Sequence, residues 1–173
     1  MSISDRMPNL DTFLAYSVAL EEEAAERHDE LADVLETHHN VEVAGVFRKL
    51  AHYSRLHAAE VREHAAGRDL PRIAPWDYCW PDLEGPETTD PTSVDYLMTE
   101  RCALEIALHN ERSARDFYEG LGRDGRTEEI RKVAAEFARE EASHVDLLLR
   151  WLERVGEDEG PPRFDPDPPH MPE

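Results

Sequence analysis

Cysteine is scarce in this sequence: among its 173 residues only Cys79 and Cys102 are cysteines. They form no CxxC pair, which excludes a cysteine-based zinc ribbon, a rubredoxin-type iron site and a thioredoxin motif. Basic residues are also few, because 19 Lys and Arg stand against 39 Asp and Glu and give a formal net charge of −20. This charge argues against nucleic acids and anionic membranes as partners, since both require a basic surface.

Long apolar runs are absent as well. No stretch approaches the roughly 18 apolar residues that a membrane helix needs. The N-terminal residues MSISDRMPNL contain no basic segment followed by an apolar one, so a secretory signal is not visible. We therefore expect a soluble, cytoplasmic protein, long enough to fold around an apolar core without a disulfide or a structural metal.

Strand signals are nearly absent, and apolar residues recur at the three- and four-residue spacing of amphipathic helices. The pattern predicts an all-α protein. Its helices are predicted over residues 9–36, 41–66, 93–121 and 127–155. Asp90 or Thr92 is expected to cap the third helix, and Gly120 and Gly122 are expected to end it.

The links between these helices differ in length. Residues 37–40 and 122–126 are short links, so the first two helices and the last two each form an antiparallel hairpin. Residues 67–92 contain five prolines, which excludes a helix between the hairpins. Residues 9–155 are therefore predicted to form a four-helix bundle with one long crossover, the arrangement of ferritin-like proteins.

The crossover and the C-terminus carry two further expectations. Trp76, Tyr78 and Trp80 of the crossover are expected to cover one end or side of the bundle, because aromatic side chains bury much apolar area. Residues 156–173 are acidic and rich in proline, and they contain too few apolar residues to pack. They are predicted to be a disordered tail.

Polar residues interrupt the apolar stripes at one level of the predicted bundle. The helical period sends the following polar side chains inward: Glu21, Ser54, His57, Glu111, Glu141 and His144. An unpaired charge in a bundle core costs several kcal/mol, so a carboxylate there is protonated, paired or bound to a metal. No lysine lies on any stripe, which leaves a metal as the simplest explanation for three carboxylates and two imidazoles.

The spacing of these residues supports a metal site. Glu141 and His144 form a Glu-x-x-His motif, whose i, i+3 spacing places both side chains on one helical face. The two hairpins also repeat each other, because 36 residues separate Glu21 from His57 and 33 separate Glu111 from His144. We therefore expect a two-metal site between the hairpins, with the ions about 3.5–4 Å apart.

The chain resembles the rubrerythrin branch of the ferritin-like superfamily over residues 9–155. The motifs that carry the resemblance are FRKLAHYSRLH, ALEIALHNERSARDFYEGL and FAREEASHVDLL. The resemblance implies a non-haem di-iron site that reacts with dioxygen or hydrogen peroxide. It also implies a set of metal ligands, namely Glu21, His57, Glu111, Glu141 and His144.

Three features depart from the family pattern. Ser54 stands where the family has the Glu of a second Glu-x-x-His motif, Ala114 stands where rubrerythrins have an additional Glu, and a rubredoxin-like domain is missing. His28 or Glu60 could partly replace the carboxylate lost at Ser54, and His28 is the preferred candidate because it lies on the core stripe; the alternative for His28 is a hydrogen-bonded structural role. Tyr118 is expected to be a core aromatic residue whose hydroxyl bonds a neighbouring carboxylate.

The favoured hypothesis is an oxidoreductase that oxidises Fe(II) and reduces O₂ or H₂O₂, in ferroxidase- or peroxidase-like chemistry. Iron is the expected cofactor, with zinc or manganese as alternatives. Two other classes of function stay open: a non-catalytic metal-binding or structural bundle whose site is altered at Ser54, and an iron carrier. The sequence does not identify the electron donor, and a homodimer is suggested only by ferritin-like relatives.

Overall fold

The computed structural model describes residues 6–74, 78, 86 and 97–156. Most of these residues are helical, and no strand is present among them. The helices are α2 (Leu10–Thr37), α3 (Val41–His64), α4 (Glu100–Asp124) and α5 (Glu128–Val155). The prediction of an all-α, ferritin-like four-helix bundle is confirmed.

Polar side chains explain where three of the helices begin. Asn9 accepts a hydrogen bond from the backbone N–H of Thr12 at 2.9 Å. Thr99 and Thr127 each accept a corresponding bond from the residue three positions later. Each bond satisfies one of the backbone donors that a helix leaves unpaired at its N-terminus.

The helix α4 starts later than the sequence predicts. The pattern places its start near residue 93, with Asp90 or Thr92 as the cap, and these positions lie outside the described residues. Thr99 is the cap of α4 in the structure, and the two described residues before it are not helical. The apolar period continues through Thr99, so the spacing of apolar residues alone does not indicate that the helix begins there.

The helix α4 also ends later than predicted, at Asp124 instead of at Gly120 or Gly122. A glycine inside a helix costs only about 1 kcal/mol, which the packing of α4 can offset. The helix ends where Gly125 caps it, and a Cβ atom at Gly125 would lie 2.4 Å from the carbonyl oxygen of Leu121. This close approach requires glycine, so Gly125 is the position that ends the helix.

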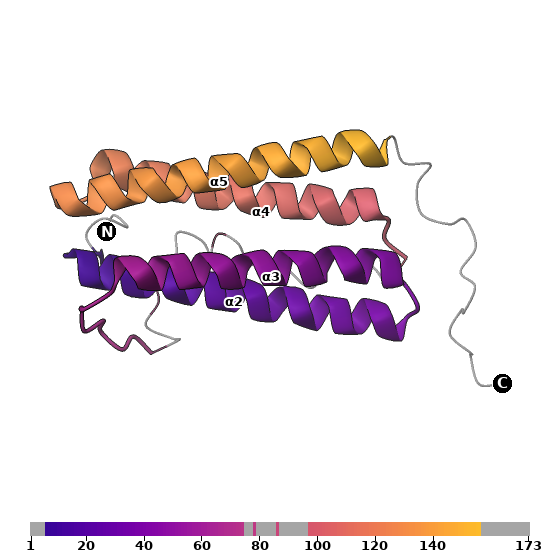
Figure 1. Ribbon diagram of the computed structural model, residues 1–173, viewed down its shortest axis with the longest axis horizontal. Helices are drawn as coiled ribbons and strands as arrows, with labels where there is room; N and C mark the ends of the chain where they lie inside the picture. The colour runs from indigo at the N-terminus through magenta and orange to yellow at the C-terminus, as the bar shows by residue number, and fades with distance from the viewer. Residues whose placement is uncertain (1–5, 75–77, 79–85, 87–96, 157–173) are drawn as a thin grey trace.

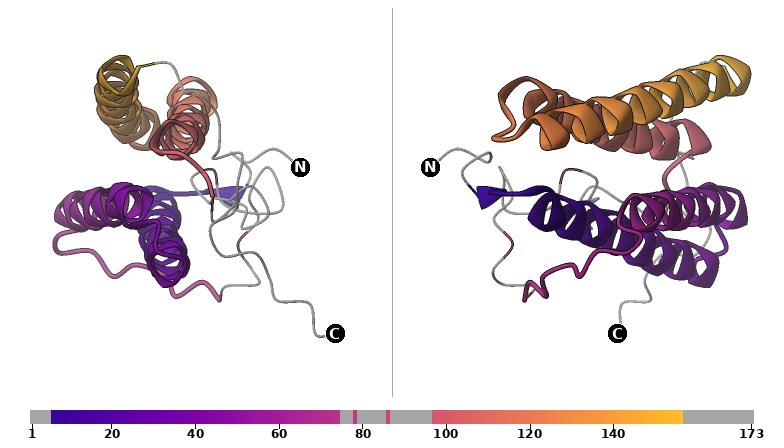
Figure 2. Two further views of the ribbon diagram at one scale, coloured as in Figure 1. Left: turned by 90° about the vertical axis from the view of Figure 1, so that its right-hand side faces the viewer. Right: turned by 60° about the vertical axis from the view of Figure 1, so that its left-hand side comes forward.

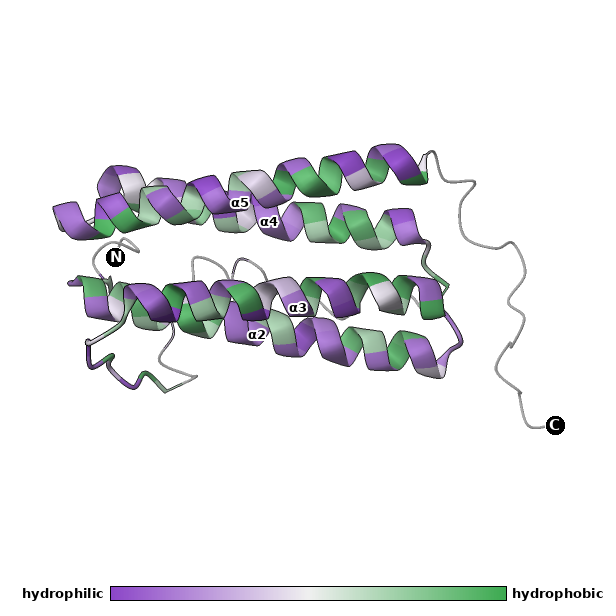
Figure 3. Ribbon diagram, in the orientation of Figure 1, coloured by the Kyte–Doolittle hydropathy of each residue, from purple (hydrophilic) through white to green (hydrophobic). Residues whose placement is uncertain are grey.

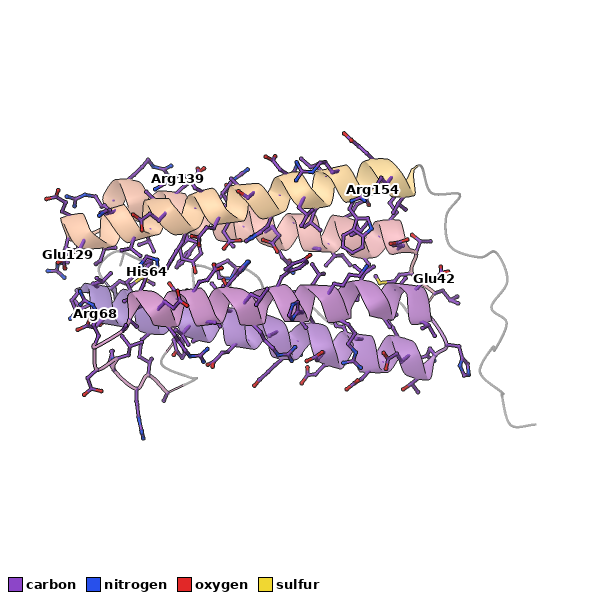
Figure 4. All side chains as sticks on the ribbon, in the orientation of Figure 1. Glu42, His64, Arg68, Glu129, Arg139 and Arg154 are labelled. Carbon is purple, nitrogen blue, oxygen red and sulfur yellow. The ribbon has the colours of Figure 1, made fainter. Side chains whose placement is uncertain are left out.

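The helices form two antiparallel pairs, because α2 packs along α3 and α4 packs along α5 (Figure 1). The two pairs contact each other less extensively, through α3 with α4 and α2 with α5, and Figure 2 shows them as two separate layers. His64 and Glu129 lie at one end of the bundle, whereas Glu42 and Arg154 lie at the other (Figure 4). The helix α3 therefore ends at one end of the bundle, and α4 begins at the other, where Met98 is hydrogen-bonded to Asn40; ferritin-like bundles have the same arrangement.

The apolar core consists of two clusters. One includes Leu35 and Leu104, and the other includes Phe13, Tyr118 and Phe137. Hydrophobic and hydrophilic segments alternate along each helix in Figure 3, as expected of amphipathic helices that bury one face. None of the described helices combines the length and the apolar composition that crossing a membrane requires.

Two contacts attach the connecting segments to the bundle. The side-chain amide of Asn40 donates a hydrogen bond to the carbonyl oxygen of Met98 at 2.7 Å, which joins the α2–α3 link to the segment before α4. Tyr78 packs edge-on against Tyr16 with a distance of 4.9 Å between ring centroids, in agreement with the covering role expected of this aromatic residue. The other features assigned to these segments, at Trp76, Trp80 and residues 157–173, lie outside the described part of the chain.

Candidate metal centre

A layer of polar side chains separates the two apolar clusters. The helix α2 contributes Glu21, α3 contributes His57, α4 contributes Glu111, and α5 contributes Glu141 and His144. Glu21 is 1% exposed and Glu141 is 3% exposed, so both carboxyl groups are buried in the bundle. The period of the apolar residues predicts this inward placement, and the structure shows it.

The five side chains are linked by a continuous series of contacts between the helix pairs. The Nδ1 atom of His57 lies 3.6 Å from a carboxylate oxygen of Glu21. The Nδ1 atom of His144 lies 3.5 Å from Glu111 and 3.1 Å from Glu141. The two imidazole rings stack across the gap between α3 and α5, with 4.1 Å between their centroids and 19° between their planes. The residues that sequence reasoning selects as ligands therefore converge, although they come from four helices.

This arrangement could hold a metal ion. One ligand atom from each of His57, Glu141 and His144 lies within 4.8 Å of the others. A cation placed among them would be offered carboxylate oxygens and imidazole nitrogens, which suit iron, zinc and manganese. Burial strengthens the fit, because carboxylates withdrawn from water need a cation or a proton to balance their charge.

The electrostatics of the layer show where that charge is balanced by protons. Burial, followed by repulsion from Glu111 and Glu21, raises the pKa of Glu141 well above its ordinary value. Burial also opposes ionisation of Glu111, but hydrogen bonds with His144 and Glu141 outweigh it and lower the Glu111 pKa. Burial opposes protonation of His144, and the hydrogen bond and negative charge of Glu111 overcome it, so the His144 pKa is raised. The raised pKa values favour the protonated forms of Glu141 and His144, and a bound cation would displace such protons.

The position of Ser54 departs from this pattern of carboxylates. Ser54 is buried, at 6% exposure, and precedes His57 on α3 by three residues, as Glu141 precedes His144 on α5. A serine hydroxyl is neutral and shorter than a glutamate side chain. The α2–α3 pair therefore presents one fewer anionic donor to the layer than the α4–α5 pair.

His28 lies next to the polar layer on α2. It is only 5% exposed, and neither of its ring nitrogens has a hydrogen-bond partner among the described residues. Its ring packs against Phe47, with 5.9 Å between the centroids. Burial lowers the His28 pKa to about 4, and the nearby Glu111 and Asp29 carboxylates only partly counteract this effect. His28 is thus a neutral, buried imidazole at neutral pH.

The two remaining candidates lie on different sides of the layer. Glu60 is exposed, and it lies close enough to Glu140 to raise that residue's pKa, after the larger effect of burial. Tyr118 is fully buried among aromatic rings, with Phe13 and Phe137 at centroid distances of 6.1 and 5.4 Å. Glu60 therefore belongs to the solvent side of the layer, whereas Tyr118 belongs to the apolar cluster beside it.

A small pocket, which the sequence pattern does not predict, borders the layer. Glu111 and His144 line the pocket together with residues of α3 and α5, among them Tyr53, Leu147 and Trp151. The space is narrow, about 10 Å³, and its wall is mostly apolar. A sequence signal for it exists, because Tyr53 precedes His57 by one helical turn and Trp151 follows His144 by two turns.

Comparisons with known proteins agree with the observed fold. The family model described as Rubrerythrin matches residues 12–86 and 103–167. A crystal structure of an uncharacterized conserved protein from Magnetospirillum magnetotacticum MS-1 is 36% identical, with a TM-score of 0.64, and the similarity covers 87% of this chain and 98% of that one. No curated protein matches the chain.

Proposed function

The chain belongs to the rubrerythrin family, and from this membership we propose that it is a non-haem di-iron oxidoreductase that oxidises Fe(II) and reduces O₂ or hydrogen peroxide. The observation that carries the proposal is the convergence of carboxylates and imidazoles from four helices at one buried level. Glu21, His57, Glu111, Glu141 and His144 are the proposed metal ligands. Iron bound there would supply the electrons for reduction of the oxidant.

The chain's own residues would perform three tasks in such a reaction. Glu111, with its lowered pKa, keeps a negative charge in the layer before a cation arrives. The raised pKa values of Glu141 and His144 favour their protonated forms in the metal-free protein, and the protons released on metal binding would offset part of the positive charge that the ions bring. The rings of His57 and His144, which stack across the gap between α3 and α5, join the two helix pairs at the site.

The size of the narrow pocket beside Glu111 and His144 favours a small molecule as the oxidant. Its apolar wall, which includes Leu147 and Trp151, leaves about 10 Å³, roughly the space for a single water-sized molecule. O₂ and hydrogen peroxide are only slightly larger than water, whereas an organic peroxide with a bulky substituent is far larger than this space.

One observation favours a second candidate function, a metal-binding or structural bundle without turnover. Ser54 provides a buried hydroxyl where the resemblance to rubrerythrins implies a carboxylate, so the site would have fewer anionic donors to stabilise Fe(III). Zinc has no redox chemistry, and a zinc ion needs fewer protein ligands than a di-iron site does. A single zinc ion held by His57, Glu141 and His144 would satisfy the geometry without any oxidation chemistry.

Metal loading followed by exposure to an oxidant tests the two candidates. The purified full chain is loaded anaerobically with Fe(II), desalted, and analysed for iron and zinc per chain before exposure to O₂ or H₂O₂. We expect close to two irons per chain and oxidation of Fe(II) much faster than in protein-free buffer. One zinc per chain, no retained iron and no oxidation above buffer would support the structural candidate and contradict the proposal.

A further inference from the structure

His28 is the buried polar side chain whose chemistry the proposed ligand set leaves unexplained. Its ring is almost fully withdrawn from water, and neither nitrogen has a hydrogen-bond partner among the described residues. Burying a polar group without a hydrogen bond costs roughly 1–3 kcal/mol in proteins. A bound metal ion would compensate this cost, because a neutral imidazole with a free lone pair is a preferred metal donor.

The register of α2 against α3 places His28 near the missing carboxylate. Two contacts fix this register: Glu21 lies beside His57, and His28 lies beside Phe47. Ser54 lies between His57 and Phe47 on α3, so it faces the part of α2 between Glu21 and His28. Side chains on a helix lean toward its N-terminus, which inclines His28 back toward the level of Glu21 and Ser54.

An electrostatic interaction relates His28 to the opposite helix pair. The negative charge of Glu111 acts on the His28 ring, so the two side chains lie within electrostatic reach of each other. Glu111 is one of the proposed ligands and contacts His144 on the same side of the layer. His28 therefore faces the layer from α2 while Glu111 faces it from α4.

We propose that His28 is a metal ligand, and that its imidazole nitrogen replaces the carboxylate donor absent at Ser54. The complete set is then three carboxylates and three imidazoles, with one histidine from each of α2, α3 and α5. The inference rests on the proposed function only in placing a metal in the polar layer, and it does not depend on turnover.

The test is a comparison of His28→Leu with the natural protein, using Co(II) as the probe under anaerobic conditions. Leucine keeps an apolar side chain of similar size in the core and removes both nitrogens. In the natural protein we expect three sets of hyperfine-shifted imidazole proton resonances, and in His28→Leu two sets. The weaker of the two Co(II) sites should also lose at least about tenfold in affinity.

Two further measurements separate ligation from a structural role. His109→Leu removes an exposed histidine from α4 and should retain all the shifted resonances and both affinities. Without metal, His28→Leu should melt at the same temperature as the natural protein or higher, because it removes a buried polar group that lacks a partner. With Co(II), its gain in melting temperature should be smaller than that of the natural protein.

The outcomes are distinguishable from failure of the proposed function. Identical sets of shifted resonances and identical Co(II) affinities in His28→Leu and the natural protein would overturn the role of His28 and leave the other ligands in place. A lower melting temperature of metal-free His28→Leu with unchanged Co(II) binding would also overturn it, in favour of a structural histidine. Absence of Co(II) and Fe(II) binding by the natural protein would instead contradict the proposed function itself.

Discussion

In the pair α4–α5, His144 lies within 3.5 Å of two carboxylates, Glu111 and Glu141, whereas in the described part of the pair α2–α3, His57 has a carboxylate of its own pair nearby in Glu21, at 3.6 Å. The residue three positions before the histidine is Glu141 in one pair and Ser54 in the other. The two helix pairs have the same arrangement, but they do not carry the same number of carboxylates in the polar layer.

This difference teaches that the backbone arrangement and the chemistry of the layer are set independently. A buried helix position accepts Glu or Ser provided that its polar atoms are satisfied, while the apolar clusters above and below hold the backbone. The consequence for metal binding is asymmetry, because a hard cation binds more tightly where more anionic oxygens surround it. We expect one tightly held metal on the α4–α5 side and a second, weaker one beside His57 and Ser54.

Removing the carboxylate that distinguishes α5 should have the largest effect. Glu141→Ala deletes a donor that contacts His144 directly, and we expect the tight site to lose affinity by about a hundredfold or more. Anaerobic Fe(II) titration followed by metal analysis measures the loss. Glu141→Gln keeps the volume and should lose affinity as well, so a cavity is not the cause.

The matched control for this change is on the same helix. Glu153→Ala removes an exposed carboxylate of α5 and should leave both metal affinities unchanged. If Glu141→Ala retained the natural metal content, the assignment of the α4–α5 side as the tight site would be wrong.

Removing the metal from the natural protein should have the next largest effect. Binding to the folded state alone adds about 2.7 kcal/mol at a free metal concentration a hundredfold above Kd. For a chain of this length, that corresponds to a melting temperature about 5–10 °C higher with metal than without. Calorimetry of the metal-free and Fe(II)-loaded protein measures the difference, and equal melting temperatures would contradict a metal site in the folded core.

The inner faces of the helices could be predicted from the sequence because burial imposes a period of 3.6 residues on each helix. Glu21 and Glu141 interrupt apolar stripes, and both are buried in the structure. The convergence of Glu111 and His144 follows from the same period applied to α4 and α5. Metal binding by these residues stays a prediction, as does the role of Ser54.

Other features could not be predicted, because they depend on how one helix is aligned against another. The pocket beside His144 is formed by Tyr53 and Trp151, which the sequence separates by almost a hundred residues. Arg48 reaches carboxylates on α2 across the hairpin, and no local pattern specifies that register. The start of α4 depends on the Thr99 cap and not on the apolar period.

Restoring a carboxylate to α3 should reduce the difference between the helix pairs. Ser54→Glu supplies an anionic donor one turn before His57, and we expect the weaker metal site to gain about tenfold in affinity. The larger side chain should destabilise the metal-free protein by roughly 1–3 kcal/mol, because it adds volume to a packed core. Fe(II) titration and urea unfolding of the same preparation measure both effects.

The double variant His28→Leu with Ser54→Glu sharpens this test. If His28 replaces the missing carboxylate, Ser54→Glu should compensate for its loss, and the affinity of the weaker site should return toward the natural value. Two equal, tight sites in the natural protein and no gain in Ser54→Glu would show that the helix pairs do not differ in metal affinity.

Neutralising a carboxylate on the outer face of α2 should have the smallest effect. Asp29 follows His28 directly, but a helix turns about 100° per residue, so its side chain points outward and pairs with Arg55 and with Arg48 at 2.9 Å. Partly exposed ion pairs contribute roughly 0.2–1 kcal/mol, and we expect Asp29→Asn to lower the free energy of unfolding by that amount at neutral pH. Burial opposes ionisation of Asp29 and is the largest single effect, but the hydrogen bonds and positive charges of Arg55 and Arg48 together outweigh it and hold the Asp29 pKa below the ordinary value of 3.8. The stabilisation is therefore present above pH 3.8 and is lost as the pH falls through the lowered pKa, so the difference between Asp29→Asn and the natural protein should disappear in acid.

Urea unfolding of the metal-free Asp29→Asn variant and of the natural protein at two pH values measures this difference in stability, and the Co(II) affinity should not change. A tenfold change in Co(II) affinity would show that the outer charges also set the difference between the helix pairs, which the inner side chains alone are expected to determine.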